Sequence, residues 1–429
     1  MKKVILLLCI IFLLFGCRKK YIDPAPSVTV GSPYENQSFN AFDTVRISAL
    51  ISDNMLVKSV KVSLFKYDNN KQVLHSLNFT PNQSEYKLNA LYHLNDLYLE
   101  SGTYYFRITA SDGNSSSSEY INISIGEASK IRTGAFIIST SGSNVNIDYM
   151  DNQNVISAFK SIVSDYGASS ENLYGQFIHV MGKNTGNLLA LNVADASEQW
   201  HVPFGASFPN LFFEEMHYAN RSLYVGFTQG VVRAYNKYGN IEYAFASPQG
   251  YKPGNILHTT NHLITEQKQI IGQGIQIAAY YNASSALRQQ LTLQGNIVAM
   301  FEINSNEVLV FANEGTNGKI WVYNIEHNQL YSQKTLIGEN IKCAAATGNE
   351  NYLVGIANDI RSYNLPSNTL LPYINSINPN LIRFDELSNN VYVVSSNVLR
   401  IYNYNSMALL HTYNHPVIIR NFHLMYNKE

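Results

Sequence analysis

Hydrophobic and polar residues alternate along several segments between residues 27 and 126. A period of two is the pattern of a β-strand with one buried face and one exposed face. Turn-forming residues separate these segments, as at 68–70 and 111–114, and predict about six or seven strands, the spacing of a β-sandwich. The residues on the predicted apolar faces are Val45, Ile47, Ala49, Ile51, Val60, Val62, Leu64, Tyr104, Phe106, Ile108, Ala110, Ile121, Ile123 and Ile125.

A second pattern repeats along residues 131–429. Each copy contains an apolar strand that ends in Tyr-Asn or a close variant, and the gaps between copies are 42, 44, 46, 42, 40 and 39 residues. Seven copies with a period of about 42 residues match four strands per blade of a β-propeller. We therefore expect an all-β chain that ends in a seven-bladed β-propeller. The anchor positions are Tyr149, Leu191, Tyr235, Tyr281, Tyr323, Tyr363 and Tyr402.

The two ends of this repeat region complete each other. Residues 416–425 resemble an inner strand with nothing after it, and residues 134–140 resemble a second strand with no inner strand before it. We expect the C-terminal strand to pair into the first blade, which closes the ring and removes the open sheet edge. In the second repeat, no convincing inner strand is found between Lys160 and Glu171.

The N-terminus has the layout of a secretory signal, with two lysines followed by the apolar run 4–15. The sequence Leu-Phe-Gly-Cys that ends at Cys17 resembles the bacterial lipobox, which implies cleavage before Cys17 and lipid attachment to it. The alternative is an ordinary signal peptide with a chance cysteine. We expect a signal peptide at 1–16, a lipidated tether at 17–26, a β-sandwich at 27–126 and the propeller at 131–429.

Composition narrows the class of protein. Apolar residues make up 45% of the chain and charged residues 14%, while 30 Tyr and 20 Phe suit half-buried strands. The formal net charge of −1 argues against a nucleic-acid partner. With Cys9 in the signal peptide and Cys17 lipidated, Cys343 stands alone, and we expect a small buried thiol without a disulfide.

Two segments resemble known families. Residues 102–113 resemble the penultimate strand of bacterial immunoglobulin-like, cadherin-like or PKD-type modules. Residues 187–200 resemble the PQQ-like repeat of quinoprotein-type propellers. Glu198, however, falls near the position where that pattern usually has Gly, and the other repeats lack a Trp at the position of Trp200. Together with the lipobox, these resemblances imply a propeller lipoprotein of the outer membrane. One known group captures nutrients or cofactors at the cell surface, and another helps to assemble outer-membrane barrels from the periplasmic side.

The loops between blades carry the candidate ligand-binding residues, Tyr166, Phe204, Phe208 and Tyr251. Aromatic faces stack on sugars, tetrapyrroles or peptide side chains, and the alternative is that Phe204 and Phe208 simply cover the blade junction. The chain has no phosphate-binding loop, nucleophile elbow or Cys/His cluster, so we predict no catalytic residue, metal or cofactor. A glycosidase needs two carboxylates across a cleft, and spacing alone does not pair the inner-strand candidates. These candidates are Glu214, Glu215, Glu302, Asp385 and Glu386.

These features favour a non-enzymatic, lipid-anchored envelope protein that binds a ligand or serves as a scaffold. Its expected partners are the membrane, through the anchor, and a protein, carbohydrate or other small molecule on the propeller. The alternative is an envelope enzyme that acts on glycans or lactones in the channel. Basic residues follow Cys17 where some lineages place acidic export signals, so the sequence leaves the membrane face open.

Overall fold

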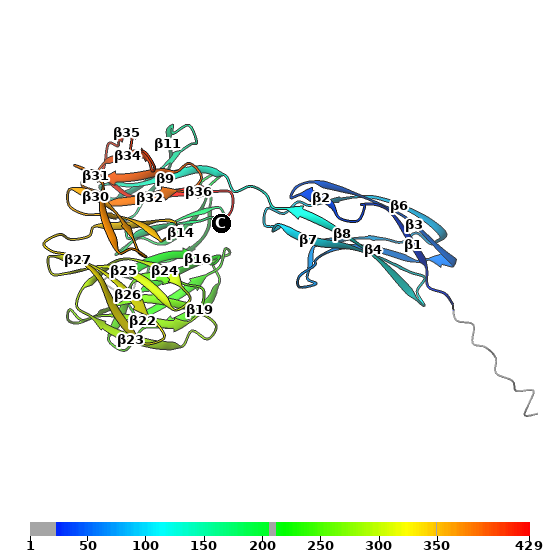
Figure 1. Cartoon of the computed structure of the whole chain (residues 1–429), viewed down its shortest axis with the longest axis horizontal. Coiled ribbons are helices and arrows are strands. Elements are labelled where there is room, and N and C mark those ends of the chain that lie inside the picture. The colour runs from blue at the N-terminus through cyan, green and yellow to red at the C-terminus, as the bar shows by residue number, and fades with distance from the viewer. Residues whose placement is uncertain (1–22, 206–211, 349) are drawn as a thin grey trace, which may run out of the picture. The chain divides into compact units, whose positions relative to one another are not determined.

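The computed structural model describes residues 23–205, 212–348 and 350–429, and every regular element in these ranges is a β-strand (Figure 1). The chain divides into two compact units, Met1–Ser129 and Lys130–Glu429. No helix in the described ranges could cross a membrane.

The first unit is a β-sandwich of two sheets. One sheet has the strand order β1-β3-β6, and the other has the order β2-β8-β7-β4-β5, with β2 and β8 parallel. The described strands are β1 (Ser27–Ser32), β2 (Gln37–Asn40), β3 (Thr44–Val57), β4 (Ser59–Lys66), β5 (Gln72–Phe79), β6 (Gln83–His93), β7 (Gly102–Ser111) and β8 (Ser116–Gly126).

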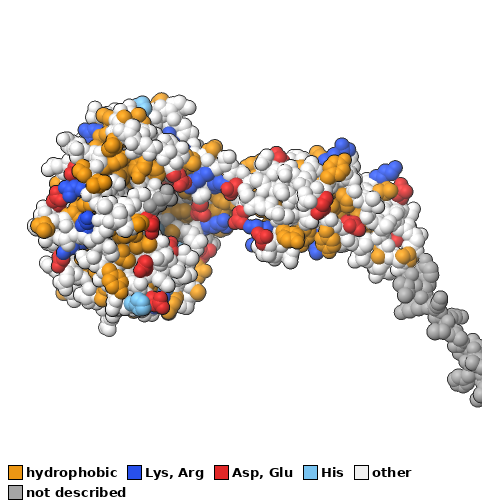
Figure 2. Space-filling view, viewed as in Figure 1, with side chains coloured by type: hydrophobic (Ala, Val, Ile, Leu, Met, Phe, Trp, Pro, Cys, Tyr) orange, Lys and Arg blue, Asp and Glu red, His pale blue; other side chains and the backbone are white. Residues whose placement is uncertain are grey.

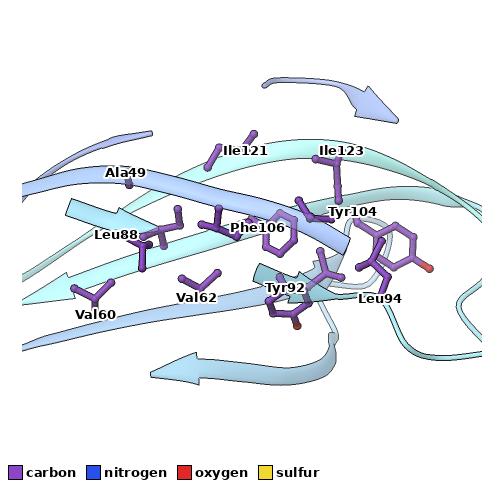
Figure 3. Packing of buried hydrophobic residues seen from close by; sticks show 14 of the residues in the cluster. Ala49, Val60, Val62, Leu88, Tyr92, Leu94, Tyr104, Phe106, Ile121 and Ile123 are labelled. Atoms are coloured by element: carbon purple, nitrogen blue, oxygen red, sulfur yellow. The ribbon is translucent and has the colours of Figure 1, made fainter. Parts of the chain in front are cut away.

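The alternating apolar residues of both sheets meet in one core, as the sequence pattern predicts (Figure 3). All the predicted apolar-face positions of this unit are buried. The Tyr92 and Phe106 rings pack edge to face, with their centroids 5.0 Å apart. The buried Tyr104 hydroxyl donates to the Glu100 carbonyl at 2.8 Å, so its polar end is satisfied inside the core.

The second unit contains seven four-stranded antiparallel sheets in its described residues. The first combines the two ends of the unit, with β36 (Ile419–Tyr426), β9 (Arg132–Ser141), β10 (Asn144–Met150) and β11 (Ile156–Val163). The second and third use β12 (Ala168–Asn172), β13 (Phe177–Met181), β14 (Leu188–Asn192), β15 (Glu198–Val202), β16 (Phe213–Ala219), β17 (Ser222–Phe227), β18 (Val231–Tyr235) and β19 (Ile241–Ala246).

The remaining four sheets also take consecutive strands. They are built from β20 (Tyr251–His258), β21 (His262–Gln269), β22 (Ile275–Tyr281), β23 (Leu287–Leu293), β24 (Asn296–Asn304), β25 (Glu307–Glu314), β26 (Asn317–Asn324), β27 (Gln329–Leu336), β28 (Cys343–Gly348), β29 (Asn351–Gly355), β30 (Asp359–Asn364), β31 (Thr369–Asn375), β32 (Leu381–Asp385), β33 (Asn390–Ser395), β34 (Val398–Asn403) and β35 (Leu409–Asn414). The first strand of each sheet contacts the first strand of the next, and β36 contacts both β12 and β32. The sheets therefore form a closed ring, the arrangement of a β-propeller.

Each repeat anchor lies in the third strand of its sheet, and in the last three repeats the Asn that follows it stabilises the next turn. The Asn324 side-chain oxygen accepts the His327 N–H at 2.9 Å, and the Asn364 oxygen accepts the Ser367 N–H at 3.0 Å. The Asn403 side-chain oxygen likewise accepts the Ser406 N–H at 2.9 Å. An Asn side chain can replace a backbone acceptor in a tight turn, which explains why the repeat ends in this residue.

The C-terminal strand closes the ring, as predicted. β36 pairs with β9 from Ile419 to Tyr426. The fully buried Asp385 of β32 joins the seventh sheet to this pair. Its carboxylate accepts the Tyr426 hydroxyl at 2.9 Å and lies 3.3 Å from the Arg132 guanidinium. The Ser388 hydroxyl donates to it at 2.7 Å.

The inner strand that the sequence pattern did not show in the second repeat is β12. It has the sequence Ala-Ser-Ser-Glu-Asn, without the apolar alternation that marks the other strands. Several of its polar side chains face a cavity and the closing strand β36, and this environment replaces the usual apolar contacts.

Cys343 is free and buried, as predicted. Burial raises the pKa of its thiol to about 12, so the thiolate form is strongly disfavoured.

We predict that Asp385→Asn weakens ring closure, because it removes the charge that faces Arg132 inside the seam. Losing one member of a buried pair should lower the free energy of unfolding of the propeller by about 3 kcal/mol. The matched control is Glu386→Gln, whose half-exposed pair with Lys130 should contribute less than about 1 kcal/mol. Urea unfolding of both variants measures the difference, and equal losses would contradict this role for Asp385.

Candidate functional site

A cavity of about 470 Å³ lies where the inner strands of the ring meet. Six of the seven inner strands contribute to its wall. Its apolar and aromatic side is formed by Phe301 of β24, Phe384 of β32 and residues 344–346 of β28. Titratable and hydroxyl side chains come from β12, β16, β32 and β36: Ser169, Ser170, Glu171, Glu215, His217, Tyr218, Arg383 and His423.

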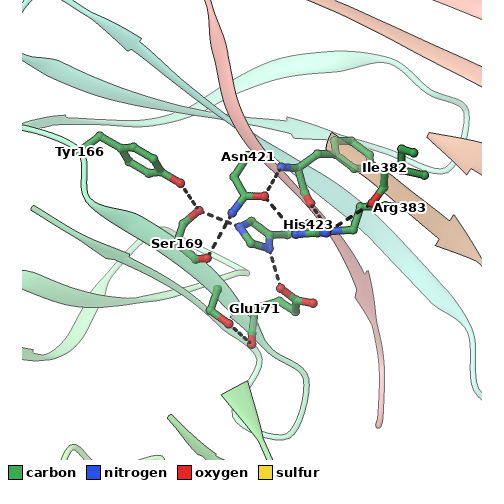
Figure 4. A network of polar contacts seen from close by, with 9 residues as sticks. Tyr166, Ser169, Glu171, Ile382, Arg383, Asn421 and His423 are labelled. Atoms are coloured by element: carbon green, nitrogen blue, oxygen red, sulfur yellow. Dashed lines mark hydrogen bonds and ion pairs between the residues drawn. The ribbon is translucent and has the colours of Figure 1, made fainter. Parts of the chain in front are cut away.

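One chain of hydrogen bonds crosses the wall from β12 to β36 (Figure 4). The Tyr166 hydroxyl lies 2.9 Å from the Ser169 Oγ, which lies 2.8 Å from the His423 Nε2. The His423 Nδ1 lies 2.5 Å from the Glu171 Oε2. Burial alone would raise the pKa of Glu171, but the charge and hydrogen bond of His423 lower it to about 2. Burial also raises the pKa of Tyr166 to about 12.

Arg383 is held by neutral groups. Its guanidinium donates to the Phe422 carbonyl at 3.2 Å, to the Asn421 side-chain oxygen at 3.2 Å and to the Ile382 carbonyl at 3.4 Å. Within the described residues, no carboxylate forms an ion pair with it. Arg383 therefore lines the cavity with a positive charge that has no directly bonded counterion.

Glu215 and His217 lie two residues apart on β16 and both line the cavity. Burial raises the pKa of Glu215 to about 7, and burial lowers the pKa of His217 to about 4. The Glu215 carboxylate accepts the Met216 N–H at 3.0 Å. Across the described ranges, the His217 ring has no hydrogen-bond partner. Both side chains keep hydrogen-bonding capacity for a bound molecule.

The other carboxylates proposed from the sequence serve structural contacts. Glu214 pairs with a lysine at 2.7 Å, Glu302 accepts a backbone N–H at 2.9 Å, and Glu386 pairs with a lysine at 2.9 Å. Asp385 lies in the closure seam. Of these five acids, Glu215 alone lines the central cavity. Within the described residues, none of the other four acids therefore faces Glu215 across the cavity.

The structure does not bring the predicted aromatic residues into one site. Tyr166 joins the cavity wall through Ser169. The Phe204 ring packs edge-on against Phe212 at 5.5 Å, and the Tyr251 hydroxyl accepts a hydrogen bond from Gln276 at 3.1 Å. Phe208 and the predicted lipid-attachment residue Cys17 lie outside the described residues.

Ser169, Glu171, Arg383 and His423 were missed by sequence reasoning. The available signal was the position of β12, since the repeat period requires an inner strand where the sequence is polar. His423 lies 254 residues from Ser169, and only ring closure makes them neighbours.

A second, larger groove of about 600 Å³ is lined by residues of the fourth and fifth sheets. Its two lysines are already engaged, because Lys252 pairs with Glu214 at 2.7 Å and Lys268 lies 3.2 Å from Glu266. The part of the chain that the structure describes contains no group of three His, Cys, Asp or Glu side chains able to hold a metal ion. We therefore take the central cavity as the candidate site.

Comparisons with known proteins do not identify this chain. No protein-family model matches it, and no curated protein matches it. Similar solved structures include the computationally designed Ika8 protein, with 13% identity, a TM-score of 0.46, and coverage of 67% of this chain and 89% of that one. Dihydro-heme d1 dehydrogenase NirN has 11% identity, a TM-score of 0.48, and coverage of 66% and 63%. BamB from Moraxella catarrhalis has 11% identity, a TM-score of 0.40, and coverage of 67% and 91%. At these TM-scores we draw no functional argument from them.

We predict that Glu215→Gln changes the pH dependence of stability. Because folding raises the pKa of this carboxyl to about 7, its stabilising contribution is complete below the unfolded pKa near 4.5 and is lost as pH rises through 7. The glutamine variant should therefore gain on the order of 2 kcal/mol relative to wild type between pH 5 and pH 8. Chemical unfolding at both pH values measures this gain, with Glu214→Gln as the control. A difference that does not change with pH would contradict the prediction.

Proposed function

We propose that this chain is a lipid-anchored protein of the cell envelope whose seven-bladed propeller binds a small polar ligand in its central cavity. In this proposal, Cys17 carries the lipid, residues 18–26 form a tether, and the sandwich is an immunoglobulin-like spacer. The outer membrane is the proposed location, because the lipobox-like sequence and the propeller resemblance both favour it.

The observation that carries the proposal is the set of polar groups in the cavity that keep hydrogen-bonding capacity or charge for a ligand. Natural proteins satisfy most buried polar groups internally, so convergent groups with free capacity favour a ligand. Arg383 offers a positive charge, His217 an unbonded ring and Glu215 a carboxyl group whose pKa burial raises. The aromatic wall at Phe301 and Phe384 suits the apolar part of the same molecule.

The linker joins the ring next to the closing strand. Ile131, where the chain enters the ring, exchanges hydrogen bonds with Asn427 just after β36 ends. β12 runs alongside β36 in the same direction, since Ser169 bonds Asn421 and Glu171 bonds His423. Tyr166 precedes β12 and therefore lies at the end of this strand away from the linker, whereas the cavity-lining Tyr218 bonds Glu429 just after β36.

The alternative, a scaffold for membrane-protein assembly, would use an outer surface of the propeller rather than the cavity. On the propeller face visible in Figure 2, acidic and basic side chains are interspersed and do not form a single-sign patch. The enzymatic alternative has one specific observation in its favour, the hydrogen-bonded chain through Ser169.

We predict that Cys17→Ser abolishes membrane attachment, because it removes the atom that would carry the acyl chains. The wild-type protein should sediment with membranes and incorporate labelled palmitate, and the variant should be soluble and unlabelled. The control is Cys343→Ser, whose buried thiol should not affect attachment. Palmitate labelling that persists in Cys17→Ser would contradict the anchor.

We predict that small molecules with a carboxylate group raise the melting temperature of the lipid-free mature chain. A panel of monosaccharides, sugar acids and short carboxylic acids should be tested by differential scanning fluorimetry. Arg383→Gln should reduce the affinity of a stabilising compound at least about tenfold, since a charged hydrogen bond contributes about 1.5 to 3 kcal/mol. Arg420→Gln, an exposed site on β36 that does not line the cavity, is the matched control. Equal effects of the two substitutions would contradict binding at Arg383.

A further inference from the structure

Ser169, His423 and Glu171 have the mutual geometry of a nucleophile, a base and the acid that orients the base. The Ser169 Oγ and His423 Nε2 are 2.8 Å apart, and the His423 Nδ1 and Glu171 Oε2 are 2.5 Å apart. Both distances lie at hydrogen-bond length, and the base is oriented through the nitrogen that does not face the serine. We infer that these three residues form a nucleophilic triad and that the cavity hydrolyses a small carboxylic ester. The inference rests on the cavity proposed above as the ligand site and adds a covalent step to it.

The distances along the chain allow the hydrogen-bond directions that this role requires. When His423 is neutral and donates its Nδ1–H to Glu171, its Nε2 lone pair accepts the Ser169 hydroxyl proton, and the charged ring that pairs with Glu171 is the state after this proton transfer. Ser169 Oγ then accepts from the Tyr166 hydroxyl. In this tautomer each donor in the chain has one acceptor, and the Ser169 hydroxyl proton is directed at the base.

The triad is placed for access to a ligand. Ser169, Glu171 and His423 all line the central cavity, and they come from two neighbouring inner strands rather than from mobile loops. Strand placement fixes the separation of the reacting groups, which favours a preorganised site.

The developing negative charge also has candidate partners. An oxyanion formed by attack of Ser169 Oγ lies two bonds from that atom, and the Tyr166 hydroxyl lies 2.9 Å from the same Oγ. Because burial raises the pKa of Tyr166, the phenol stays protonated and remains a donor at neutral pH. Arg383 adds positive charge to the same cavity.

The reaction balances without a cofactor. The Ser169 Oγ attacks the ester carbonyl carbon while its proton moves to the His423 Nε2. The carbon–oxygen bond to the alcohol then breaks, and the alcohol leaves with that proton. Water attacks the acyl-serine, gives a proton to His423, and releases the carboxylic acid as Ser169 regains its proton. The net change is one ester and one water converted to one acid and one alcohol.

The cavity limits the class of substrate. A volume of about 470 Å³ admits a small molecule and excludes a folded chain. Phe301, Phe384 and the short side chains of residues 344–346 give the apolar part of a small ester a surface to pack against.

The test is covalent labelling of the folded, lipid-free mature chain with a fluorophosphonate, with the modified residue located by mass spectrometry. We expect modification at Ser169, and hydrolysis of p-nitrophenyl acetate that Ser169→Ala abolishes. His423→Gln and Glu171→Gln should each slow labelling, the former about 100-fold or more. Ser161→Ala is the matched control, because this exposed hydroxyl donates to the Asn146 side chain at 2.8 Å and does not line the cavity. It should label at the wild-type rate.

Three results would overturn the inference: no labelling of the folded wild-type chain, labelling at another residue, or an unchanged rate in His423→Gln. Circular dichroism and the melting temperature establish that each variant is folded, and Glu171→Gln provides a second variant that keeps the size of the side chain. If labelling fails while the carboxylate panel still stabilises the wild type through Arg383, the triad is refuted and the binding proposal stands. If no compound of the panel stabilises the wild type and Ser169 is labelled, the proposal of carboxylate binding at Arg383 is refuted and the triad stands.

Discussion

Ring closure by the C-terminal strand is the constraint on which the rest of the propeller depends. β36 pairs with β9, which begins almost 300 residues earlier, and no open edge remains at the seam between the two ends. Loop closure over this distance carries an entropic cost, which the ladder and the buried Asp385 contacts must offset. The same pairing places His423 beside Ser169 and Glu171. Closure of the fold and assembly of the candidate site are therefore one event.

The polar groups of the cavity fall into two kinds. Tyr166, Ser169, His423 and Glu171 satisfy one another, and such a network adds rigidity in a low-dielectric interior. Arg383, by contrast, has neutral partners only, and its charge is available to a ligand. A rigid network beside a group with free capacity is the usual organisation of a binding site, in which one set of residues positions and the other recognises.

Much of the fold could be predicted from the sequence because apolar periodicity reports directly on burial. The alternation that includes Val45 and Phe106 predicts the sandwich core, and the Tyr-Asn anchors predict the third strand of each sheet because Asn caps the turn that follows. β12 could not be recognised in this way, because Ser169 and Glu171 face a polar cavity rather than an apolar core. The candidate site lies in the strand where the repeat pattern fails, because polar residues that face the cavity stand where the other inner strands have apolar residues.

The most direct measurement of the central claim is a crystal structure of the protein purified from its own envelope without added ligand. The account predicts electron density for a small molecule in the central cavity, in contact with the Arg383 guanidinium and the His217 ring. A cavity filled with ordered water, together with a partner protein or ligand bound on the outer surface of the ring, would contradict it.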